Sequence, residues 1–228
     1  PEKTSKTRIK CVEAESLEAA TIYYINDNEG RLYELSDDQG TLVATDPSLY
    51  SSTKVAPDAA GSSKIRAAIG CVKTVDALVL TIDRTNLPGP DRIIDNTVGP
   101  GRSAFVSFAE AFRKAAAQEL DVGLEELTTG VQPFKYNQTA QSSRVVLADA
   151  LENGAGYCAL LAEKEVLERV LIKGMYESLS EKWDSEEHRS SCDSSCPNCL
   201  RSYDNRHLHG QLDWRLALDV IEICIDGE

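Results

Sequence analysis

The sequence predicts an α+β (or α/β) domain in which helices pack on a mixed β-sheet. Two observations support this class. Apolar or alternating runs of strand length occupy much of residues 21–83, and long stretches with helical spacing of apolar residues dominate residues 105–225. Because strands and helices bury their apolar faces against each other, such a mixture predicts one packed domain over residues 1–228. A chain of 228 residues is long enough to bury a sizeable core.

Two runs near the N-terminus predict a β-hairpin. Residues 21–25 (TIYYI) are β-branched or aromatic, residues 26–30 (NDNEG) are turn-forming, and residues 31–35 (RLYEL) alternate polar and apolar. Strand propensity on both sides of a glycine-containing turn favours antiparallel pairing. Residues 36–63 are rich in Asp, Gly, Ser, Thr and Pro, so we expect a long loop with at most one short strand, at 42–44.

Four further strands are expected. Residues 65–72 and 75–82 form a pair with a break between them, and the apolar run ALVLTI at 77–82 predicts a central strand of the sheet. Residues 84–102 contain three prolines and three glycines and predict a second loop. The last two strands are expected at 130–136 and 143–149.

The first helix of the second half is expected to begin at Ser107, because Glu110 follows three residues later as in a capping box. It is expected to end at residues 120–123 (LDVG). Its apolar stripe comprises Phe105, Phe108, Phe112, Ala115 and Ala116. Its outward face comprises Arg113, Lys114 and Gln118.

Two more helices follow. Residues 157–183 predict a long helix that is broken near Gly174. Residues 212–225 predict a terminal helix whose polar residues recur at i, i+4, i+7 and i+11, namely Arg215, Asp219, Glu222 and Asp226. Since only this narrow stripe is polar, the terminal helix is expected to be mostly buried.

Three cysteines lie within eight residues of one another near the C-terminus. Cys192, Cys196 and Cys199 are spaced C-x3-C-x2-C on turn-forming residues, so their thiolates can converge on one cation. Tetrahedral zinc takes four Cys or His ligands. The chain has seven cysteines, an odd number, and no apolar targeting stretch, which argues against a disulfide framework. The spacing therefore predicts a structural zinc knuckle over residues 186–210.

The fourth ligand has two main candidates. His188 lies four residues before the first of these cysteines, so that one knuckle can close locally. Cys158 follows the glycine-rich turn 154–156 at a helix start, where the helix dipole favours a thiolate. His207 and His209 are weaker candidates. The remaining cysteines are expected to be ordinary core residues: Cys11, Cys71 and Cys224.

The formal net charge of −13 disfavours a free-standing nucleic-acid binder. Residues 200–215 differ, with three arginines and two histidines against two aspartates. This strip offers charge-assisted donors and an aromatic face to nucleic acid: Arg201, Tyr203, Asn205, Arg206, His207 and His209. Alternatively, these residues pair internally with Asp193, Asp204 and Asp213 and lock the knuckle. No apolar run approaches the ~20 residues of a membrane span, and we expect a cytoplasmic protein.

A series of short motifs runs along nearly the whole chain. They are INDNEG at 25–30, IG at 69–70 with TVD at 74–76, SFAEAF at 107–112, Asp149 before GAGY at 154–157, and SCPNCLRSYDN at 195–205 continued by HGQLDW at 209–214. In this order they resemble the MrfA-type zinc-binding domain, a C-terminal domain of superfamily-two DEAD/DEAH-box helicases. Proteins with this domain include a mitomycin-repair helicase and the DrmB protein of the DISARM phage-defence system.

The resemblance implies a zinc-stabilised accessory domain of a DNA helicase or translocase, in DNA repair or phage defence. Its implied partners are the motor lobes of the parent chain and single-stranded or forked DNA. The chain begins at Pro1 and has neither a G-x-x-x-x-G-K-[ST] phosphate loop nor a D-E-x-H/D box, so we expect a domain cut from a longer protein, without an ATPase. Many relatives place a fourth cysteine where this chain has Ser190, so His188 or Cys158 must substitute.

Two other functions stay open. The domain can be a protein-interaction module that docks a defence or repair partner through its acidic surface. It can also be a metal-dependent nuclease in which Asp76, Asp149 and Glu152 hold Mg²⁺, although no lysine follows a strand at a suitable place. The turn at 154–156 can receive a phosphate on its backbone amides, but the neighbouring carboxylates favour tight helix packing there instead.

Overall fold

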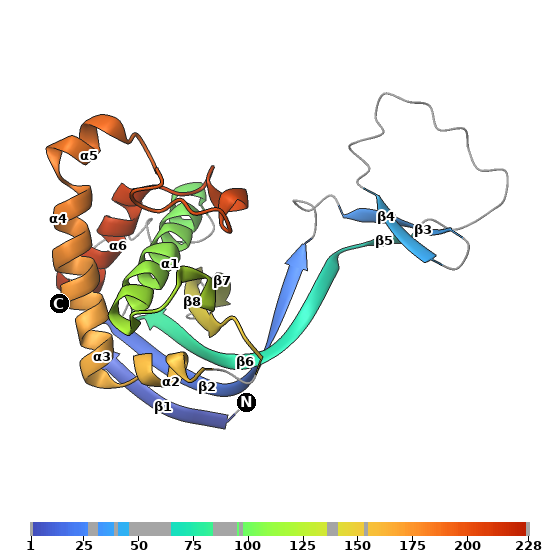
Figure 1. The fold of residues 1–228 in the computed structure, drawn as a ribbon, viewed down its shortest axis with the longest axis horizontal. Coiled ribbons are helices and arrows are strands. Elements are labelled where there is room, and N and C mark those ends of the chain that lie inside the picture. The colour runs from blue at the N-terminus through green and yellow to red at the C-terminus, as the bar shows by residue number, and fades with distance from the viewer. Residues whose placement is uncertain are drawn as a thin grey trace. The chain divides into compact units, whose positions relative to one another are not determined.

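The computed structural model describes residues 2–26, 32–38, 41–45, 65–83, 95, 98–135, 141–152 and 155–226. The contacts divide the chain into two compact units (Figure 1). Unit 1 comprises residues 1–20 and 74–228, and unit 2 comprises residues 21–73. Two long strands, β2 (Val12–Asn26) and β6 (Ile69–Ile82), contribute residues to both units.

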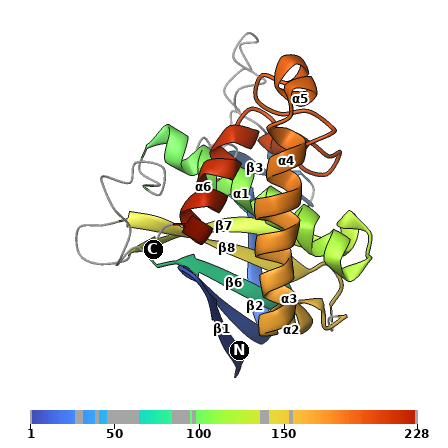
Figure 2. The same ribbon diagram turned by 90° about the vertical axis from the view of Figure 1, so that its left-hand side faces the viewer.

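A five-stranded sheet has the order β1-β2-β6-β8-β7, as the strands follow one another in Figure 2. Its other strands are β1 (Glu2–Ile9), β7 (Leu127–Lys135) and β8 (Gln141–Asp149). The pairs β1–β2, β6–β8 and β7–β8 are antiparallel. Leu78 of β6 lies opposite Leu147 of β8, and both are fully buried, which confirms a central strand at 77–82 and the two strands predicted before residue 150.

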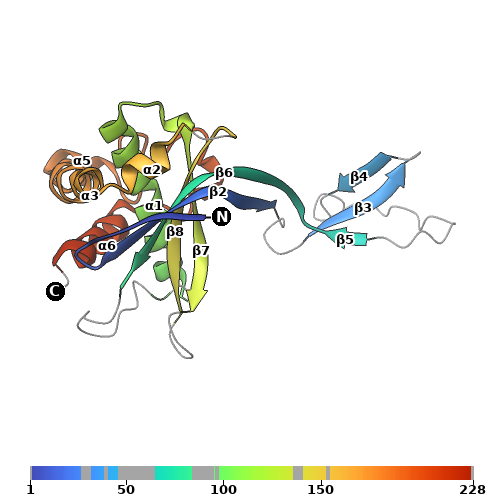
Figure 3. The same ribbon diagram turned by 90° about the horizontal axis from the view of Figure 1, so that it is seen from below.

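Helices cover one side of this sheet (Figures 2 and 3). The central helix α1 (Gly99–Leu120) contacts β7, β8, α6 (Trp214–Asp226) and the π-helical segment η3 (Arg169–Leu179). The shorter helices are α2 (Tyr157–Leu161), α3 (Lys164–Glu168), α4 (Ser180–Trp183) and α5 (Glu186–Ser191), with 3-10 turns η2 (Leu124–Glu126) and η4 (Arg206–Leu208). The predicted apolar stripe of α1 is confirmed, because Phe105, Phe108 and Phe112 are fully buried.

The predicted start of α1 at Ser107 is wrong. The helix begins at Gly99 with Pro100 in its first turn, where the missing N–H of proline has no intrahelical partner to lose. Ser107 lies inside the helix and its hydroxyl oxygen accepts a hydrogen bond from the backbone N–H of Asp213 at 2.9 Å. The outward assignment of Arg113 is also wrong, since this side chain is buried. The predicted end is confirmed by Asp121, in the left-handed region with φ 54°.

The long helix predicted at 157–183 is interrupted earlier than expected. The chain turns between α2 and α3 at residues 162–163, whereas Gly174 lies inside η3. A Cβ added to Gly174 would stand 3.3 Å from the Cβ of Ala115. The absence of a side chain at Gly174 lets η3 pack closely against α1. Because Gly174 lies within η3, the predicted break near this residue is wrong. The predicted terminal helix is confirmed as α6, with Arg215, Glu222 and Asp226 exposed.

Unit 2 contains a three-stranded sheet with the order β4-β3-β5. Its strands are β3 (Tyr33–Asp38), β4 (Thr41–Thr45) and β5 (Ile65–Ala67). The predicted hairpin of 21–25 with 31–35 is wrong, because residues 21–25 continue β2 in the five-stranded sheet while β3 pairs with β4 and β5. The strand predicted at 42–44 lies in β4. Of the two predicted loops, residues 39–40, 46–63, 84–94 and 96–97 lie outside the described residues, whereas residues 99–102 form the start of α1.

Two further findings concern the cysteines outside the knuckle and the absence of a membrane-spanning helix among the described residues. Cys11 and Cys224 are buried as predicted, but Cys71 is exposed on β6, so its assignment to the core is wrong. Within the described part of the chain, no helix combines the length and the apolar character needed to cross a membrane.

Candidate metal centre

Four potential ligand atoms converge at one end of unit 1. His188, Cys192, Cys196 and Cys199 each offer one atom, and these atoms all lie within 4.8 Å of one another. The Ser185 hydroxyl caps α5 by accepting from the backbone N–H of His188 at 3.3 Å, which fixes the histidine in the first turn. The cysteines follow on the turns after this helix, so one continuous segment brings the group together.

The distances fit a tetrahedral zinc ion. Zinc bonds of about 2.3 Å to sulfur and about 2.0 Å to nitrogen require ligands about 3.5–3.8 Å apart. The Sγ atoms of Cys192 and Cys199 lie 3.9 Å apart, and Cys196 Sγ lies 3.6 Å from His188 Nε2. Cys196 also donates its backbone N–H to Cys199 Sγ at 3.1 Å, a contact that stabilises a thiolate. The donor set and its spacing are therefore those of a closed structural zinc site.

Trp183 and Trp214 contact His188, and Trp214 also contacts Cys192. His188 Nδ1 lies 2.8 Å from the carbonyl oxygen of Trp183, so the ring donates there and presents the lone pair of Nε2 to the cysteines. The rings of His188 and Trp214 meet edge to face at 5.2 Å. Trp214 Nε1 donates to the carbonyl oxygen of Cys192 at 3.1 Å. These contacts join α4 and α6 to the site.

Cys158, the other candidate for a fourth ligand, lies outside this group. It is buried at the start of α2, and its thiol contacts the carbonyl oxygen of Leu147 on β8 at 3.5 Å. Burial and the neighbouring carboxylate of Asp149 raise the pKa of the Cys158 thiol well above its usual value. A buried thiol of this kind is favoured in its neutral form, which does not ligate.

The thiols of the knuckle differ in their acidity when no metal is bound. Burial, together with hydrogen bonds and charges from the other two cysteines, raises the pKa of Cys192 to about 12. Burial also acts to raise the pKa of Cys196, but hydrogen bonds from His188 and the Asn198 backbone outweigh it and lower this pKa to about 7. Zinc requires all three as thiolates, so its binding releases protons, chiefly from the two more buried thiols.

Asn205 is buried and organises the turn that follows the last ligand, Cys199. Its Nδ2 donates at 2.9 Å both to Glu110 Oε2 of α1 and to the carbonyl oxygen of Leu200. Its Oδ1 accepts from the Ser202 backbone N–H at 2.8 Å and lies 3.0 Å from His209 Nε2. The structure thus places two residues of the predicted nucleic-acid strip, Asn205 and His209, in internal hydrogen bonds.

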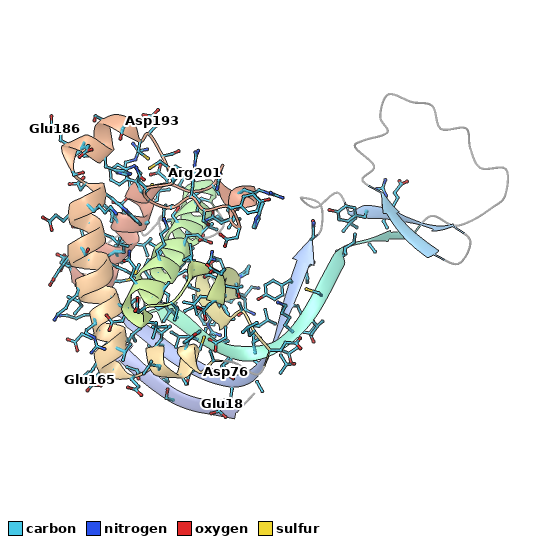
Figure 4. The ribbon with its side chains drawn as sticks, in the orientation of Figure 1. Glu18, Asp76, Glu165, Glu186, Asp193 and Arg201 are labelled. Atoms are coloured by element: carbon cyan, nitrogen blue, oxygen red, sulfur yellow. The ribbon has the colours of Figure 1, made fainter. Side chains whose placement is uncertain are left out.

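Other residues of the strip lie nearer solvent. Tyr203 is 83% exposed, and the guanidinium of Arg206 lies over its ring, 4.9 Å from the centroid. His207 is exposed beside them. Arg201 is half-buried and donates through Nε to the Ser195 hydroxyl at 2.9 Å; Figure 4 shows it with Asp193 at the knuckle end of the unit. The predicted nucleic-acid strip therefore divides in two. Arg201, Asn205 and His209 make hydrogen bonds within the domain, whereas Tyr203 and Arg206 form an exposed pair.

A buried ion-pair network connects this turn to α1. Arg113 donates through Nε and Nη2, at 2.8 Å each, to the carbonyl oxygens of Leu127 and Leu124. Its guanidinium also lies 3.4 Å from Glu110 Oε2 and 2.5 Å from Asp204 Oδ2. Glu110 and Arg113 are both about as buried as core residues, and burial raises the pKa of Glu110 although Asn205 and Arg113 oppose this shift.

A Glu110→Gln variant is expected to show a different pH dependence of stability. The folded pKa of Glu110 is raised, so its contribution is fully present below about pH 4.5 and is lost as the pH rises through the folded value. The unfolding free energy of the variant relative to the unaltered chain should therefore increase between about pH 5 and about pH 8. Urea denaturation at both pH values measures this difference, with the exposed Glu125→Gln as control. A difference that does not change with pH would contradict the prediction.

The three carboxylates of the nuclease alternative do not form a metal-binding group among the described residues, although Asp76 and Asp149 lie on paired strands, next to the partners Ala77 and Ala148. Asp149 caps the start of α2 by accepting from the backbone N–H groups of Ala155, Gly156 and Cys158 at 2.8–3.3 Å. Asp76 accepts from the backbone N–H of Ala19 at 3.1 Å and lies at the other end of the unit from the knuckle (Figure 4). Within the ranges that the structure describes, the His/Cys group is the one cluster suited to a metal. These contacts also occupy the amides proposed to receive a phosphate.

Several residues around the centre were not predicted from the sequence. Lys114 of α1 donates to the carbonyl oxygen of Cys199, and Arg215 of α6 donates to that of Asp193. Burial lowers the pKa of Lys114, while the thiolates of Cys199 and Cys196 act to raise it. No signal in the sequence pointed to these contacts, because they join positions 85 and 22 residues apart.

Residues 108–200 match the family described as the MrfA Zn-binding domain, a stretch that begins within α1 and ends just past Cys199. The Druantia protein DruE of Escherichia coli (strain UMEA 4076-1) is 26% identical over 184 residues, which cover 79% of this chain and 9% of that protein. The crystal structure of the DUF1998 helicase MrfA bound to DNA is similar over 97% of this chain and 24% of that chain, with TM-score 0.51 and 10% identity. The chain thus corresponds to a small part of each relative. Residues 108–200 are therefore similar to the MrfA Zn-binding domain, and zinc is the cofactor that the His/Cys group of this chain suits.

Proposed function

We propose that this chain is the zinc-stabilised accessory domain of a DNA helicase or translocase, and that His188, Cys192, Cys196 and Cys199 are its zinc ligands. The observation that supports this most is the convergence of the four ligand atoms within 4.8 Å. Zinc supplies a fixed tetrahedral crosslink of the knuckle over residues 186–210. The protein then holds this crosslink against two helices, through Trp214 of α6 and Lys114 of α1.

The crosslink has a consequence for the segment that follows it. Residues 200–209 follow the last ligand, Cys199, and are tied to α1 through Asn205 and Asp204. This arrangement presents Tyr203 and Arg206 to solvent as a stacked pair. An aromatic ring with a guanidinium above it offers a stacking surface and a charge to single-stranded or forked DNA. Such a contact would act together with the motor lobes of a longer protein, in DNA repair or phage defence.

Fluorescence anisotropy with labelled single-stranded and forked DNA tests this role. Tyr203→Ala with Arg206→Ala is expected to weaken binding by about ten-fold or more, from the loss of about 1–3 kcal/mol of stacking. The affinity of the unaltered chain should fall steeply with added salt. Tyr23→Ala with Arg66→Ala is the matched control, because it removes an exposed tyrosine and an exposed arginine of unit 2, away from the knuckle. Equal losses in both double variants, or no DNA binding at low salt, would contradict the DNA-binding role.

A groove between η3, α4 and α6 supports a second candidate, a module that docks a partner protein. Five carboxylates line it against one arginine, namely Glu177, Glu181, Asp184, Asp219 and Glu222 with Arg215. Burial and the neighbouring charges of Glu222 and Asp213 raise the pKa of Asp219, so a basic segment would relieve their repulsion. A stable complex that is lost on Glu181→Lys, in a chain without DNA affinity, would favour this function.

A further inference from the structure

We propose that Lys114 of α1 is the charge-balancing residue of the zinc centre, and that its ammonium slows the loss of zinc and protects the thiolates from electrophiles. The inference rests on the ligand set proposed above. It concerns a residue 74 positions before the first ligand, on a different element of the fold.

The ligand set leaves a net charge that needs a partner. Zinc carries two positive charges, three thiolates carry three negative charges, and the imidazole of His188 is neutral. The loaded centre therefore carries one net negative charge. Cys199 is fully buried and Cys192 is 4% exposed, so much of this charge lies away from water. A buried charge is costly unless an opposite charge stands near it.

Two cationic side chains, Lys114 of α1 and Arg215 of α6, donate to backbone carbonyls of the knuckle. They differ in whether a carboxylate already balances their charge. Arg215 donates to the Asp193 carbonyl oxygen, but its guanidinium also contacts the Asp213 carboxylate, at 3.1 Å through both Nε and Nη2. Lys114 donates to the carbonyl oxygen of Cys199 and, among the residues that the structure describes, makes no ion pair with a carboxylate. The charge of Arg215 is thus balanced by Asp213, whereas that of Lys114 is available to the thiolates.

The surroundings of Lys114 point the same way. Its neighbour on α1, Glu110, is engaged by Arg113 and Asn205. The lysine lines a groove together with Cys199, Asn198 and Lys182, and the Lys182 side chain is exposed. Among the three cysteines of the ligand set, Cys196 is partly exposed, whereas Cys192 and Cys199 are buried. Attack by a chelator or an electrophile is therefore expected to begin at Cys196, and a positive charge nearby lowers the nucleophilicity of the cluster.

The test compares zinc loss from the loaded chain with its Lys114→Gln, Lys114→Arg and Lys182→Gln variants. Glutamine removes the charge and keeps an N–H donor on a side chain one atom shorter, and arginine keeps the charge. Zinc transfer to a chromogenic chelator is followed over time, and alkylation of Cys196 by iodoacetamide is followed by peptide mass spectrometry. Lys114→Gln is expected to speed both reactions about ten-fold, within the range for residues that support metal ligands. Lys114→Arg and Lys182→Gln should behave like the unaltered chain.

Three outcomes would overturn the inference. Rates for Lys114→Gln equal to those of the unaltered chain would show that the charge does not act on the centre. Equal acceleration in Lys182→Gln would assign the effect to the general potential of the groove. A lower melting temperature of Lys114→Gln without faster zinc loss would make the lysine a packing residue. Absence of zinc from the unaltered chain would instead overturn the ligand set itself, so the two failures are distinguishable.

Discussion

Replacing His188 by alanine is expected to leave the purified chain with far less than one zinc per molecule, whereas Cys158→Ala keeps about one. The histidine supplies the fourth ligand atom of the group, 3.6 Å from Cys196 Sγ, while the thiol of Cys158 contacts β8. Structural zinc contributes on the order of 10 kcal/mol to the folding of small sites, so this loss should also loosen residues 184–213. Elemental analysis of protein purified under reducing, chelator-free conditions measures the zinc content.

Hydrogen exchange distinguishes local from global loss in the same variant. Exchange should accelerate in α5 and in the turns up to α6, while the central strands β6 and β8 stay protected, because their contacts lie in the sheet core. Full zinc content in His188→Ala together with loss in Cys158→Ala would reverse the ligand assignment. Chelation of zinc from the unaltered chain should give the same exchange pattern as His188→Ala.

Arg113→Met is expected to lower the free energy of unfolding by about 3–5 kcal/mol, the usual result of removing one partner from a buried ion pair. The variant leaves the Glu110 carboxylate without its guanidinium and leaves the carbonyls of Leu124 and Leu127 without a donor. It also frees Asp204 from its 2.5 Å contact to α1. Urea denaturation followed by circular dichroism measures the change.

The control for this variant is Arg169→Met. Arg169 pairs with Glu119 at 2.6 Å, but the arginine is 44% exposed, and an exposed pair contributes at most about 1 kcal/mol. A loss of similar size in both variants would show that burial of Arg113 does not matter. A small loss in Arg113→Met alone would mean that water or a rearranged Lys114 replaces the guanidinium.

The sequence predicted elements whose pattern was strong and local. The strand at 77–82 and the apolar stripe of α1 are runs of large apolar residues, and burial requires them to lie inside. The first hairpin, β1 with β2, was not predicted because several of its inward residues, such as Ala14 and Ser16, are small or polar and weaken the hydrophobic alternation. The α1 start was misplaced because glycine and proline at 99–101 suit a loop as well as a first helical turn.

The sequence predicted the part of the candidate site whose residues lie close together in the chain. The cysteines and His188 lie within twelve residues, so their spacing alone brought them together. Spacing could not choose between His188 and Cys158, since that choice depends on where α2 and α5 stand in the fold. Nor could it show that Asn205 faces α1, because its partner Glu110 lies 95 residues earlier. Contacts between distant segments follow from the packing of whole elements, which local pattern does not determine.

The contact of Cys11 with α6 has a consequence for how the domain is made. Its thiol lies 3.3 and 3.1 Å from the carbonyl oxygens of Ile223 and Cys224, more than 200 residues later. On the ribosome, the N-terminal hairpin therefore waits for its last neighbour until α6 has been synthesised, and α1 waits with it because α6 covers its outer side. The knuckle, which leans on Trp214, is completed at the same late moment. We therefore expect the contact between the knuckle and α6 to form late in synthesis, whereas the four ligands, which lie within twelve residues, can meet earlier.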